Sequence, residues 1–335
     1  MFVKQSQYRR NFLLLTIFFV IAFAITLLLG SFRIVSSAHA QTESAEPQVE
    51  LATDSVVIHR YSAPPHDQVN SYWIETEEGV IIVDAQRFLS QARYLTEEIQ
   101  AVTDKPLLGI FITHHHTDHI GGLPALIEVF DSNVPIYASE FVRDDIETDG
   151  SGFLARRKEL HGNDFPAPED IPLPNQIVAD SNTIELGNLT FEVIEFRDNE
   201  TPVSTLYYLA EQNALFVGDF VTNQRVPFLR NQQSGNWITQ LQELRDRYPD
   251  QTVYSGHGEP DLVQPLVEAE VSYIETVRNL VAEAIITDNE VSPEEKTNIL
   301  AELEQRYPDY QRSLMAPSLL LANIDAVAEE LQGQS

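Results

Sequence analysis

The stretch that decides the fold is Thr113-His114-His115-His116-Thr117-Asp118-His119-Ile120-Gly121-Gly122. An unbroken apolar run, residues 106–112, precedes it. This run predicts a buried strand that ends where the histidines begin. The Gly-Gly pair that closes the stretch predicts a tight backbone turn into a helix over residues 123–130.

The spacing His-x-His-x-Asp-His is what a site for two metal ions requires. The imidazoles of His114 and His116 can converge on one ion, while Asp118 and His119 reach a second ion beside it. The alternative is a solvated polar loop with coincidental histidines. Five ligand-type side chains within six residues, between an apolar strand and Gly-Gly, favour the metal site.

Two segments further along the chain can supply the missing ligands. The apolar run 214–217 leads into Gly218-Asp219, and residues 252–255 lead into a histidine between two glycines, His257. Each segment alone is weak, because Gly-Asp is a common turn and a single Gly-His-Gly has no fixed meaning. Their order after the first motif predicts that both carry metal ligands.

At this point the chain resembles the metallo-β-lactamase superfamily, over about residues 56–258. The resemblance includes the segments 70–74 and 80–84. It implies an α/β fold, a four-layer αβ/βα sandwich with the metals at one edge of two packed sheets. It also implies that Asp84 supports the site rather than binding metal. Composition alone indicates only a soluble mixed α/β protein.

One departure from the family pattern concerns Glu200. The family normally carries a histidine in a Gly-His-Thr-Pro-Gly-like segment before the Gly-Asp, but this chain has no histidine between His161 and His257. Glu200, followed by Thr-Pro, takes that place. A glutamate there resembles the alkylsulfatase branch, although that branch more often has Glu where this chain has Asp219. The alternative is a surface glutamate in an acidic loop.

The resemblance implies a complete set of metal ligands. His114, His116 and Glu200 bind the first ion, and Asp118, His119 and His257 bind the second. Asp219 bridges both ions, and Asp118 is also catalytic because it orients the attacking water. We expect two divalent ions, with zinc first and manganese or iron as options, because three anionic ligands also suit harder ions.

Two arginines downstream of the Gly-Asp are candidates for substrate binding. Arg225 and Arg230 could hold an anionic head group, because a guanidinium pairs with sulfate, carboxylate or phosphate through two hydrogen bonds. The alternative is ordinary surface charge.

The N-terminus has the order of a secretory signal. Residues 1–10 carry three basic and no acidic residues, residues 11–30 are almost wholly apolar, and Ala38-His39-Ala40 forms an Ala-x-Ala site. This order predicts a signal peptide over 1–40 and a periplasmic or extracellular protein. The apolar run could also span a bilayer as an uncleaved anchor with the protein facing outward. The polar, acidic residues 41–53 predict a flexible tether.

The rest of the chain divides into a catalytic domain over 54–261 and a helical appendage over 262–335. Amphipathic patterns predict appendage helices over residues 262–286, 292–305 and 317–331. Residues 143–175 have weak periodicity and predict an insertion over the site.

Composition excludes several classes of site and partner. The chain lacks cysteine, which excludes disulfides and iron-sulfur clusters. Its net charge is −30, and without residues 1–40, which hold four basic and no acidic residues, it becomes 17 minus 51, or −34. Such a surface repels polyanions, so we expect no nucleic-acid partner, and a membrane partner only through an uncleaved N-terminus.

The sequence therefore predicts an exported dinuclear metal-dependent hydrolase. The resemblance to alkylsulfatases indicates a small ester as substrate, such as an alkyl sulfate. A β-lactam, lactone or thioester hydrolase has the same chemistry. A protein of another class, a non-catalytic binding module on the same fold, stays open.

Overall fold

The computed structural model describes residues 48–53, 55–63, 69–286, 290–312 and 318–333. All of them belong to the unit that comprises residues 47–335. The predicted signal peptide, its cleavage site and residues 41–47 of the predicted tether lie outside the described residues. Among the helices that are described, none is both long and apolar enough to cross a membrane.

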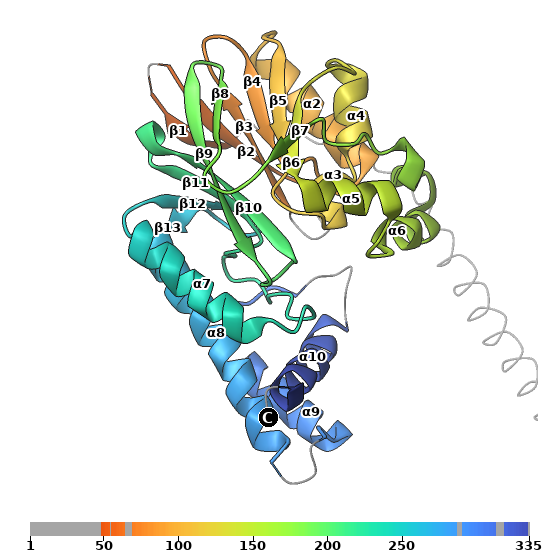
Figure 1. Cartoon of the computed structure of the whole chain (residues 1–335), viewed down its shortest axis with the longest axis vertical. Coiled ribbons are helices and arrows are strands. Elements are labelled where there is room, and N and C mark those ends of the chain that lie inside the picture. Colours follow the sequence, from red (N-terminus) through yellow and green to blue (C-terminus); the bar gives the residue numbers. More distant parts are fainter. Residues whose placement is uncertain (1–47, 54, 64–68, 287–289, 313–317, 334–335) are drawn as a thin grey trace, which may run out of the picture. The chain divides into compact units, whose positions relative to one another are not determined.

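Two packed sheets form the centre of this unit (Figure 1). The first sheet runs antiparallel from β1 to β4 and parallel from β4 to β7. Its strands, in spatial order, are β1 (Gln48–Ala52), β2 (Val57–Ser62), β3 (Asn70–Glu75), β4 (Val80–Val83), β5 (Leu107–Phe111), β6 (Ile136–Ser139) and β7 (Gln176–Val178).

The second sheet is antiparallel except for one parallel pair, β11 with β12. Its strands, in spatial order, are β13 (Asp261–Leu262), β12 (Thr252–Ser255), β11 (Ala214–Gly218), β10 (Val203–Leu209), β9 (Leu189–Arg197) and β8 (Thr183–Leu186).

Helices cover the outer faces of both sheets. The α-helices are α2 (Leu89–Val102), α3 (Thr117–Ile120), α4 (Leu123–Val129), α5 (Glu140–Thr148), α6 (Phe153–His161), α7 (Ser234–Arg247), α8 (Val263–Ala284), α9 (Pro293–Arg306) and α10 (Leu319–Gly333). Short 3₁₀ turns occupy Gly162–Asp164, Pro168–Asp170 and Ala210–Gln212.

The alternation of side chains along each strand creates the layers. In β4, Ile81 and Val83 pack between the sheets with Phe216, while Val80 and Ile82 belong to the core under the first layer of helices. A third core lies between the second sheet and helices α7 to α10. Successive residues of a strand point to opposite faces, so both faces of each sheet are buried. The predicted four-layer α/β sandwich with C-terminal helices is confirmed.

Two segments differ from the sequence-based expectation. Residues 48–52, predicted as part of the tether, form β1, because alternating Val49 and Leu51 allow pairing with β2 and Glu50 accepts a 2.8 Å hydrogen bond from Arg60. Residues 143–175, predicted as an insertion over the site with weak periodicity, are largely helical, and part of them lines the cavity over the clusters. Ser139 caps α5, and Asp149, in the left-handed conformation, accepts hydrogen bonds from the first turn of α6.

The three helices predicted for the appendage are present as α8, α9 and α10, with ends shifted by one to two residues. Ser292 and Glu295 form a capping box at the start of α9, which explains why that boundary is sharp.

Candidate metal centre

The candidate ligands gather at one edge of the sandwich because strands of both sheets end there. His114 and His116 follow β5, Asp219 follows β11, and His257 follows β12. Asp118 and His119 lie in the short helix α3, and Glu200 lies in the turn between β9 and β10. The carboxyl ends of the parallel pair β11 and β12 meet at the same edge, which brings Asp219 beside His257.

One cluster contains the ligand-type atoms of His114, His116, Glu200 and Asp219, all within 4.8 Å of one another. His116 Nδ1 lies 2.9 Å from Glu200 Oε1, and His114 Nε2 lies 3.9 Å from Glu200 Oε2. Glu200 is 2% exposed, so it is not a surface glutamate.

A second cluster contains Asp118, His119, Asp219 and His257, again within 4.8 Å of one another. His257 Nε2 lies 3.4 Å from Asp118 Oδ2 and 3.3 Å from Asp219 Oδ2, and His119 Nε2 lies 3.5 Å from Asp219 Oδ1. Asp219 belongs to both clusters, the position that a bridging carboxylate occupies. The structure thus brings together all seven residues that the sequence predicts as metal ligands.

Buried polar atoms in the clusters indicate that the clusters are suited to hold cations. His119 Nε2, Glu200 Oε2 and Asp219 Oδ1 are buried without a hydrogen-bond partner among the described residues. Buried polar groups are almost always satisfied, and buried carboxylates are costly unless a positive charge compensates them. The two clusters together contain three carboxylates and four imidazoles. Divalent zinc, manganese and iron all bind donors of these kinds. The residues present fit two metal ions.

The pKa values agree with this fit. Burial lowers the pKa of His114 well below its ordinary value, so its imidazole is neutral and able to bind a metal. Burial also disfavours the charged form of His119, but the carboxylates of Asp219 and Asp84 outweigh it and raise the pKa of His119. Because a cation would take over the role of that proton, metal binding should release protons.

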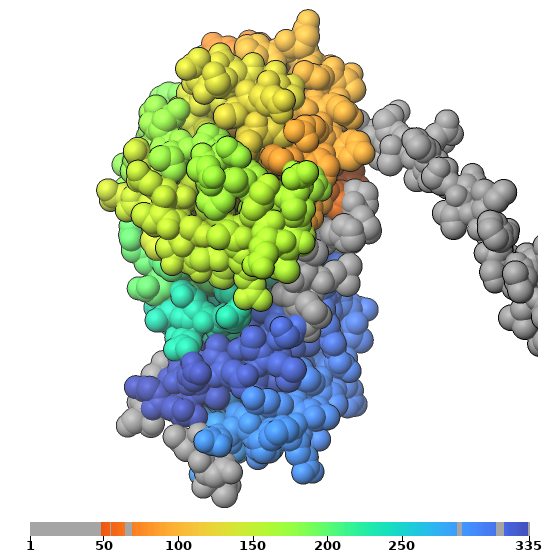
Figure 2. Space-filling view, turned by 90° about the vertical axis from the view of Figure 1, so that its right-hand side faces the viewer, coloured from red at the N-terminus to blue at the C-terminus, as the bar shows by residue number. Residues whose placement is uncertain are grey.

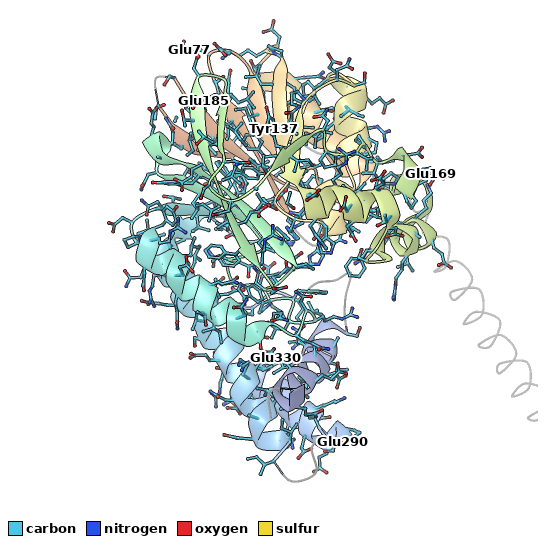
Figure 3. The ribbon with its side chains drawn as sticks, viewed as in Figure 1. Glu77, Tyr137, Glu169, Glu185, Glu290 and Glu330 are labelled. Atoms are coloured by element: carbon cyan, nitrogen blue, oxygen red, sulfur yellow. The ribbon has the colours of Figure 1, made fainter. Side chains whose placement is uncertain are left out.

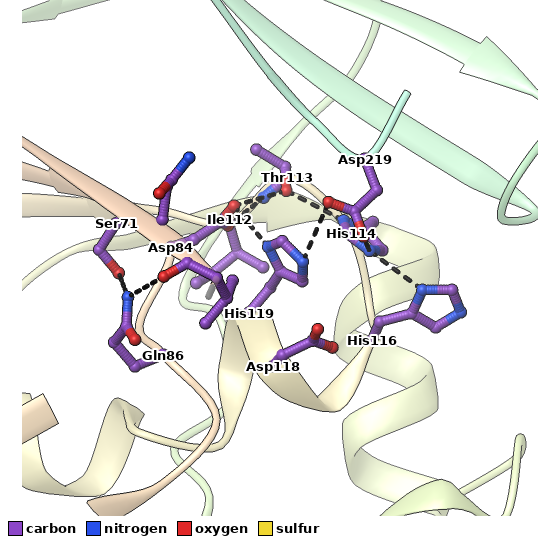
Figure 4. A network of polar contacts seen from close by, with 12 residues as sticks. Ser71, Asp84, Gln86, Ile112, Thr113, His114, His116, Asp118, His119 and Asp219 are labelled. Carbon is purple, nitrogen blue, oxygen red and sulfur yellow. Dashed lines mark hydrogen bonds and ion pairs between the residues drawn. The ribbon is translucent and has the colours of Figure 1, made fainter. Parts of the chain in front are cut away.

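Asp84 fixes the orientation of His119 by hydrogen bonding (Figure 4). It accepts hydrogen bonds from the Thr113 amide at 2.9 Å and the Thr113 hydroxyl at 2.8 Å, and from His119 Nδ1 at 2.8 Å. His119 therefore turns its Nε2 toward Asp219, the arrangement that orients metal-binding histidines. Asp84 holds a left-handed conformation, φ 61°, and its predicted supporting role is the one its contacts show.

Glycines allow the strand ends to approach each other. A Cβ at Gly218, where φ is 55°, would collide with Thr113 Oγ1, and one at Gly256 would collide with Asp219 Oδ1. The residues before Asp219 and His257 must be this small for both clusters to form.

Arg87 is a residue of the site that the sequence reasoning missed. Its Nη2 lies 2.9 Å from Asp118 Oδ2 and its Nη1 donates to Thr117 Oγ1 at 3.1 Å. Its position shortly after Asp84, in the loop that follows β4, is the only sequence signal, and it does not show that the side chain reaches Asp118. Burial raises the pKa of Asp118, but Arg87 and His257 outweigh burial and hold that pKa well below its ordinary value.

His115 lies outside both clusters despite its place in the motif. Its Nδ1 makes a 2.8 Å hydrogen bond with Thr201 Oγ1, and its ring packs edge-on against Phe141. Burial lowers the pKa of His115 to about 2, so the ring is neutral. His115, a residue of the first motif, therefore stabilises the turn that carries Glu200.

Arg225 and Arg230 both line a cavity of about 310 Å³ over the clusters. Arg225 is buried, whereas Arg230 is exposed and its guanidinium carbon lies 5.7 Å from the centre of the Phe228 ring. The ring of Phe228 in turn lies 4.9 Å from that of His116. Both arginines predicted for substrate binding therefore lie at the site.

A family model described as the metallo-beta-lactamase superfamily matches residues 64–257 of the chain. The chain belongs to the metallo-β-lactamase superfamily. It is a hydrolase of that superfamily with a candidate metal site, and the match ends at His257, before the appendage.

Two curated relatives of this superfamily hydrolase are similar over short segments. A linear primary-alkylsulfatase from Pseudomonas sp. (strain ATCC 19151) is 41% identical over 81 residues, which cover 23% of this chain and 15% of the relative. A hydroxyacylglutathione hydrolase from Shewanella halifaxensis (strain HAW-EB4) is 38% identical over 74 residues, covering 21% and 27%. The matches thus span under a third of either relative's length.

Among solved structures, a double mutant of the sec-alkyl sulfatase PisA1 is similar with a TM-score of 0.61 and 16% identity. The similarity covers 86% of this chain and 51% of PisA1. It supports the fold, including the C-terminal helices. The match to a curated alkylsulfatase agrees with the resemblance to that branch that the sequence shows at Glu200.

Proposed function

We propose that this superfamily member is an exported dinuclear hydrolase of small anionic esters, with an alkyl sulfate as the first candidate substrate. The observation that carries the proposal is the position of Glu200. It takes the place of the family's usual histidine, is buried, and lies 2.9 Å from His116. The chain therefore resembles the alkylsulfatase branch at the position where that branch departs from the rest of the superfamily.

The ligand assignment is part of this proposal. His114, His116 and Glu200 would hold one ion, Asp118, His119 and His257 would hold the other, and Asp219 would bridge them. Two divalent ions, with zinc the first choice, would lower the pKa of a bound water and polarise the ester group. A side-chain nucleophile is then unnecessary.

Residues around the clusters have distinct roles in hydrolysis. Asp118 accepts a hydrogen bond from the attacking water and so orients it, while Arg87 holds Asp118 in place. Arg225 and Arg230 bind the anionic group of the substrate through charge-assisted hydrogen bonds. A buried arginine next to a metal pair is suited to a group that bears negative charge before and after the reaction.

A thioester is the second candidate substrate, because a hydroxyacylglutathione hydrolase is among the relatives. Arg225 and Arg230, which line the cavity over the clusters, argue for a substrate whose reacting group is itself anionic, as a sulfate ester is and a thioester is not. A non-catalytic binding module that has lost one metal is not favoured, since both clusters are complete.

The proposal of export rests on the N-terminal residues 1–40 alone. N-terminal sequencing of the secreted and membrane fractions tests it. A chain that starts at Gln41 supports cleavage, and an intact Met1 in membranes establishes an anchor.

A panel of substrates on zinc-loaded protein tests the reaction. It should contain a short alkyl sulfate, a β-lactam, a lactone, a thioester and a phosphodiester, each with and without prior removal of metal by a chelator. We expect the alkyl sulfate to be hydrolysed fastest and the activity to disappear on chelation. Preference for any other member by tenfold or more would overturn the substrate assignment.

A further inference from the structure

The loop that follows Asp219 is held by the C-terminal appendage. Val226 N donates a 3.0 Å hydrogen bond to Gln311 O, and Gln311 N donates one of 2.7 Å to Gln224 O. Arg225, between these residues, forms a β-bridge with Gln311. Gln311 lies outside residues 64–257, which the family model matches. It nevertheless fixes the backbone around Arg225, a predicted substrate-binding residue.

Asn323 of α10 holds the next part of the same loop. Its Nδ2 donates to Pro227 O at 2.7 Å, and its Oδ1 accepts from Leu229 N at 3.0 Å. The side chain is 1% exposed, so both hydrogen bonds are made away from water. Phe228, between the two contacted residues, is the ring that packs against His116. The position of this ring over the clusters thus depends on α10.

Helix α10 is itself anchored to the catalytic unit by Glu330 (Figure 3). Its carboxylate accepts hydrogen bonds from the amides of Ser234 at 2.9 Å and Gly235 at 3.0 Å, at the start of α7, and from Arg278 Nη1 of α8 at 2.6 Å. Burial raises the pKa of Glu330, but these hydrogen bonds outweigh it and lower that pKa, so the carboxylate is charged. Helix α10 is therefore held in place against α7 and α8.

The cavity over the clusters has one side from α10 and another from α6. Figure 2 shows the yellow-green segment with α5 and α6 above the dark-blue segment with α10 on one face of the molecule. Leu319 and Ala322 of α10 line the cavity together with Arg156, Arg157 and Leu160 of α6. These residues lie beyond the metal ligands, where the non-reacting part of a substrate must be placed.

Apart from the members of the two clusters, every charged residue that lines this cavity is basic. Its acidic lining residues are all cluster members, and its basic ones are five arginines, in a chain of net charge −30: Arg87, Arg156, Arg157, Arg225 and Arg230. A neighbouring cavity of about 610 Å³ shares His116, Glu200 and Arg230, but its other charged lining residues are acidic, Asp144 and Asp145. An anionic group is therefore attracted to the first cavity and not to the second.

We propose that α6 and α10 form a subsite for the non-reacting part of the substrate, and that this part is a short apolar chain ending in a second negative charge. This inference rests on the proposed function. Arg225 takes the reacting anionic group near the metals, Leu319 and Ala322 contact the apolar chain, and Arg156 with Arg157 takes the distal anion. The substrate class is an ester with a carboxylate or similar anion at the far end.

Alkanesulfonates test this subsite without any turnover, because their C–S bond is not hydrolysed. The probes are ethane-1,2-, butane-1,4- and hexane-1,6-disulfonate and the matched monosulfonates, titrated calorimetrically into zinc-loaded protein. We expect at least one disulfonate to bind about tenfold tighter than its monosulfonate, the gain of one partly exposed ion pair with hydrogen bonds.

Variants assign the effect to residues. The double substitution Arg156→Gln with Arg157→Gln should remove the preference for the disulfonate. The control, Arg245→Gln with Arg247→Gln, makes an equal charge change on α7 outside the cavity and should leave the preference intact. Ala322→Phe should weaken both probe types, and Ala322→Leu serves if the larger ring lowers the thermal midpoint.

The outcomes separate the two proposals. Equal binding of disulfonates and monosulfonates, or equal loss in the α7 control, overturns the subsite. A retained disulfonate preference in a protein that hydrolyses no member of the ester panel keeps the subsite and overturns only the reaction.

Discussion

Arg87 Nη2 lies 2.9 Å from Asp118 Oδ2, and both side chains are buried at the edge of the metal-ligand clusters. The same carboxylate oxygen lies 3.4 Å from His257 Nε2. The Asp118 carboxylate thus contacts both the Arg87 guanidinium and another candidate ligand of the second ion, His257. Its orientation is set by a residue in the loop after β4 and not only by its neighbours in the histidine motif.

Replacing Arg87 by lysine should therefore impair turnover while leaving metal in place. Lysine keeps the charge but cannot contact Asp118 and Thr117 together. We expect kcat/KM on the best ester to fall roughly ten- to hundredfold, the usual effect of a residue behind a metal ligand. Arg93→Gln, which breaks an exposed ion pair with Glu128 on the neighbouring helices, is the control and should change nothing. Metal content near that of the parent with activity within threefold would contradict the role of Arg87.

Asp118→Ala should abolish turnover with the fold largely intact. The substitution removes a candidate ligand of the second ion and the group that orients the attacking water, so two contributions are lost together. Circular dichroism and the thermal midpoint check the fold, and metal content is measured alongside. If the variant at full metal loading turns over within threefold of the parent, Asp118 has neither role.

His59 should make the protein less stable in mild acid. Its ring stacks on Trp73 with centres 3.6 Å apart, and burial lowers its pKa from 6.5 to about 4, against an opposing effect of Glu75. Above pH 6.5 the ring is neutral in both the folded and unfolded chain. Between pH 6.5 and 4 the unfolded chain binds the proton and the folded chain does not, so the free energy of unfolding falls, by about 3 kcal/mol over the whole window.

His59→Phe keeps the stack but removes the titration. Between pH 7.5 and 5.0, the parent should lose about 2 kcal/mol more of its free energy of unfolding than the variant, measured by urea unfolding in matched buffers. Parallel pH dependences of the two proteins would show that His59 is not the source.

Asn323→Leu tests the clamp between α10 and the loop at Pro227–Leu229. The substitution leaves two buried backbone groups without partners, which costs about 1–3 kcal/mol of stability. We expect a raised KM, a kcat close to that of the parent and unchanged metal content, because Phe228 and Arg230 shift while the ligands do not.

Two comparisons distinguish positioning from general destabilisation. Asn323→Asp, which keeps an acceptor for Leu229 N, should recover part of the KM. Thr276→Val removes a 2.8 Å hydrogen bond to Tyr307 elsewhere in the appendage and should lower stability without changing KM. A KM that rises equally in Thr276→Val would show that the loop is not held specifically by Asn323.

The candidate metal centre could be predicted from the sequence because its candidate ligands follow apolar strands or lie in a compact motif. The run 106–112, the segments before Asp219 and His257, and the Thr-Pro after Glu200 each mark a backbone position that the fold then brings to one edge. Arg87 could not be predicted in the same way, because its approach to Asp118 depends on left-handed backbone at Asp84 and Gln86 in the loop that carries it.

The remaining misses concern weak local signals. Helix α6 has charged residues on most sides and is held by Asp149 and by packing, so no periodicity marked it. Strand β1 lies within residues 41–53, whose polar and acidic composition hid its alternation, and pairing with β2 decides its structure. The contact of Asn323 with Pro227 and Leu229 joins residues far apart in the chain, which no local pattern reveals.

Metal content of Glu200→Ala, measured by plasma mass spectrometry against the parent, tests the central claim most directly. The parent should hold two ions per chain and the variant about one, because the first cluster would keep only His114, His116 and the shared Asp219. Glu200→His should restore two ions, with zinc favoured over manganese, since an imidazole replaces a negative charge. Two tightly bound ions and parental ester hydrolysis in Glu200→Ala would contradict the account.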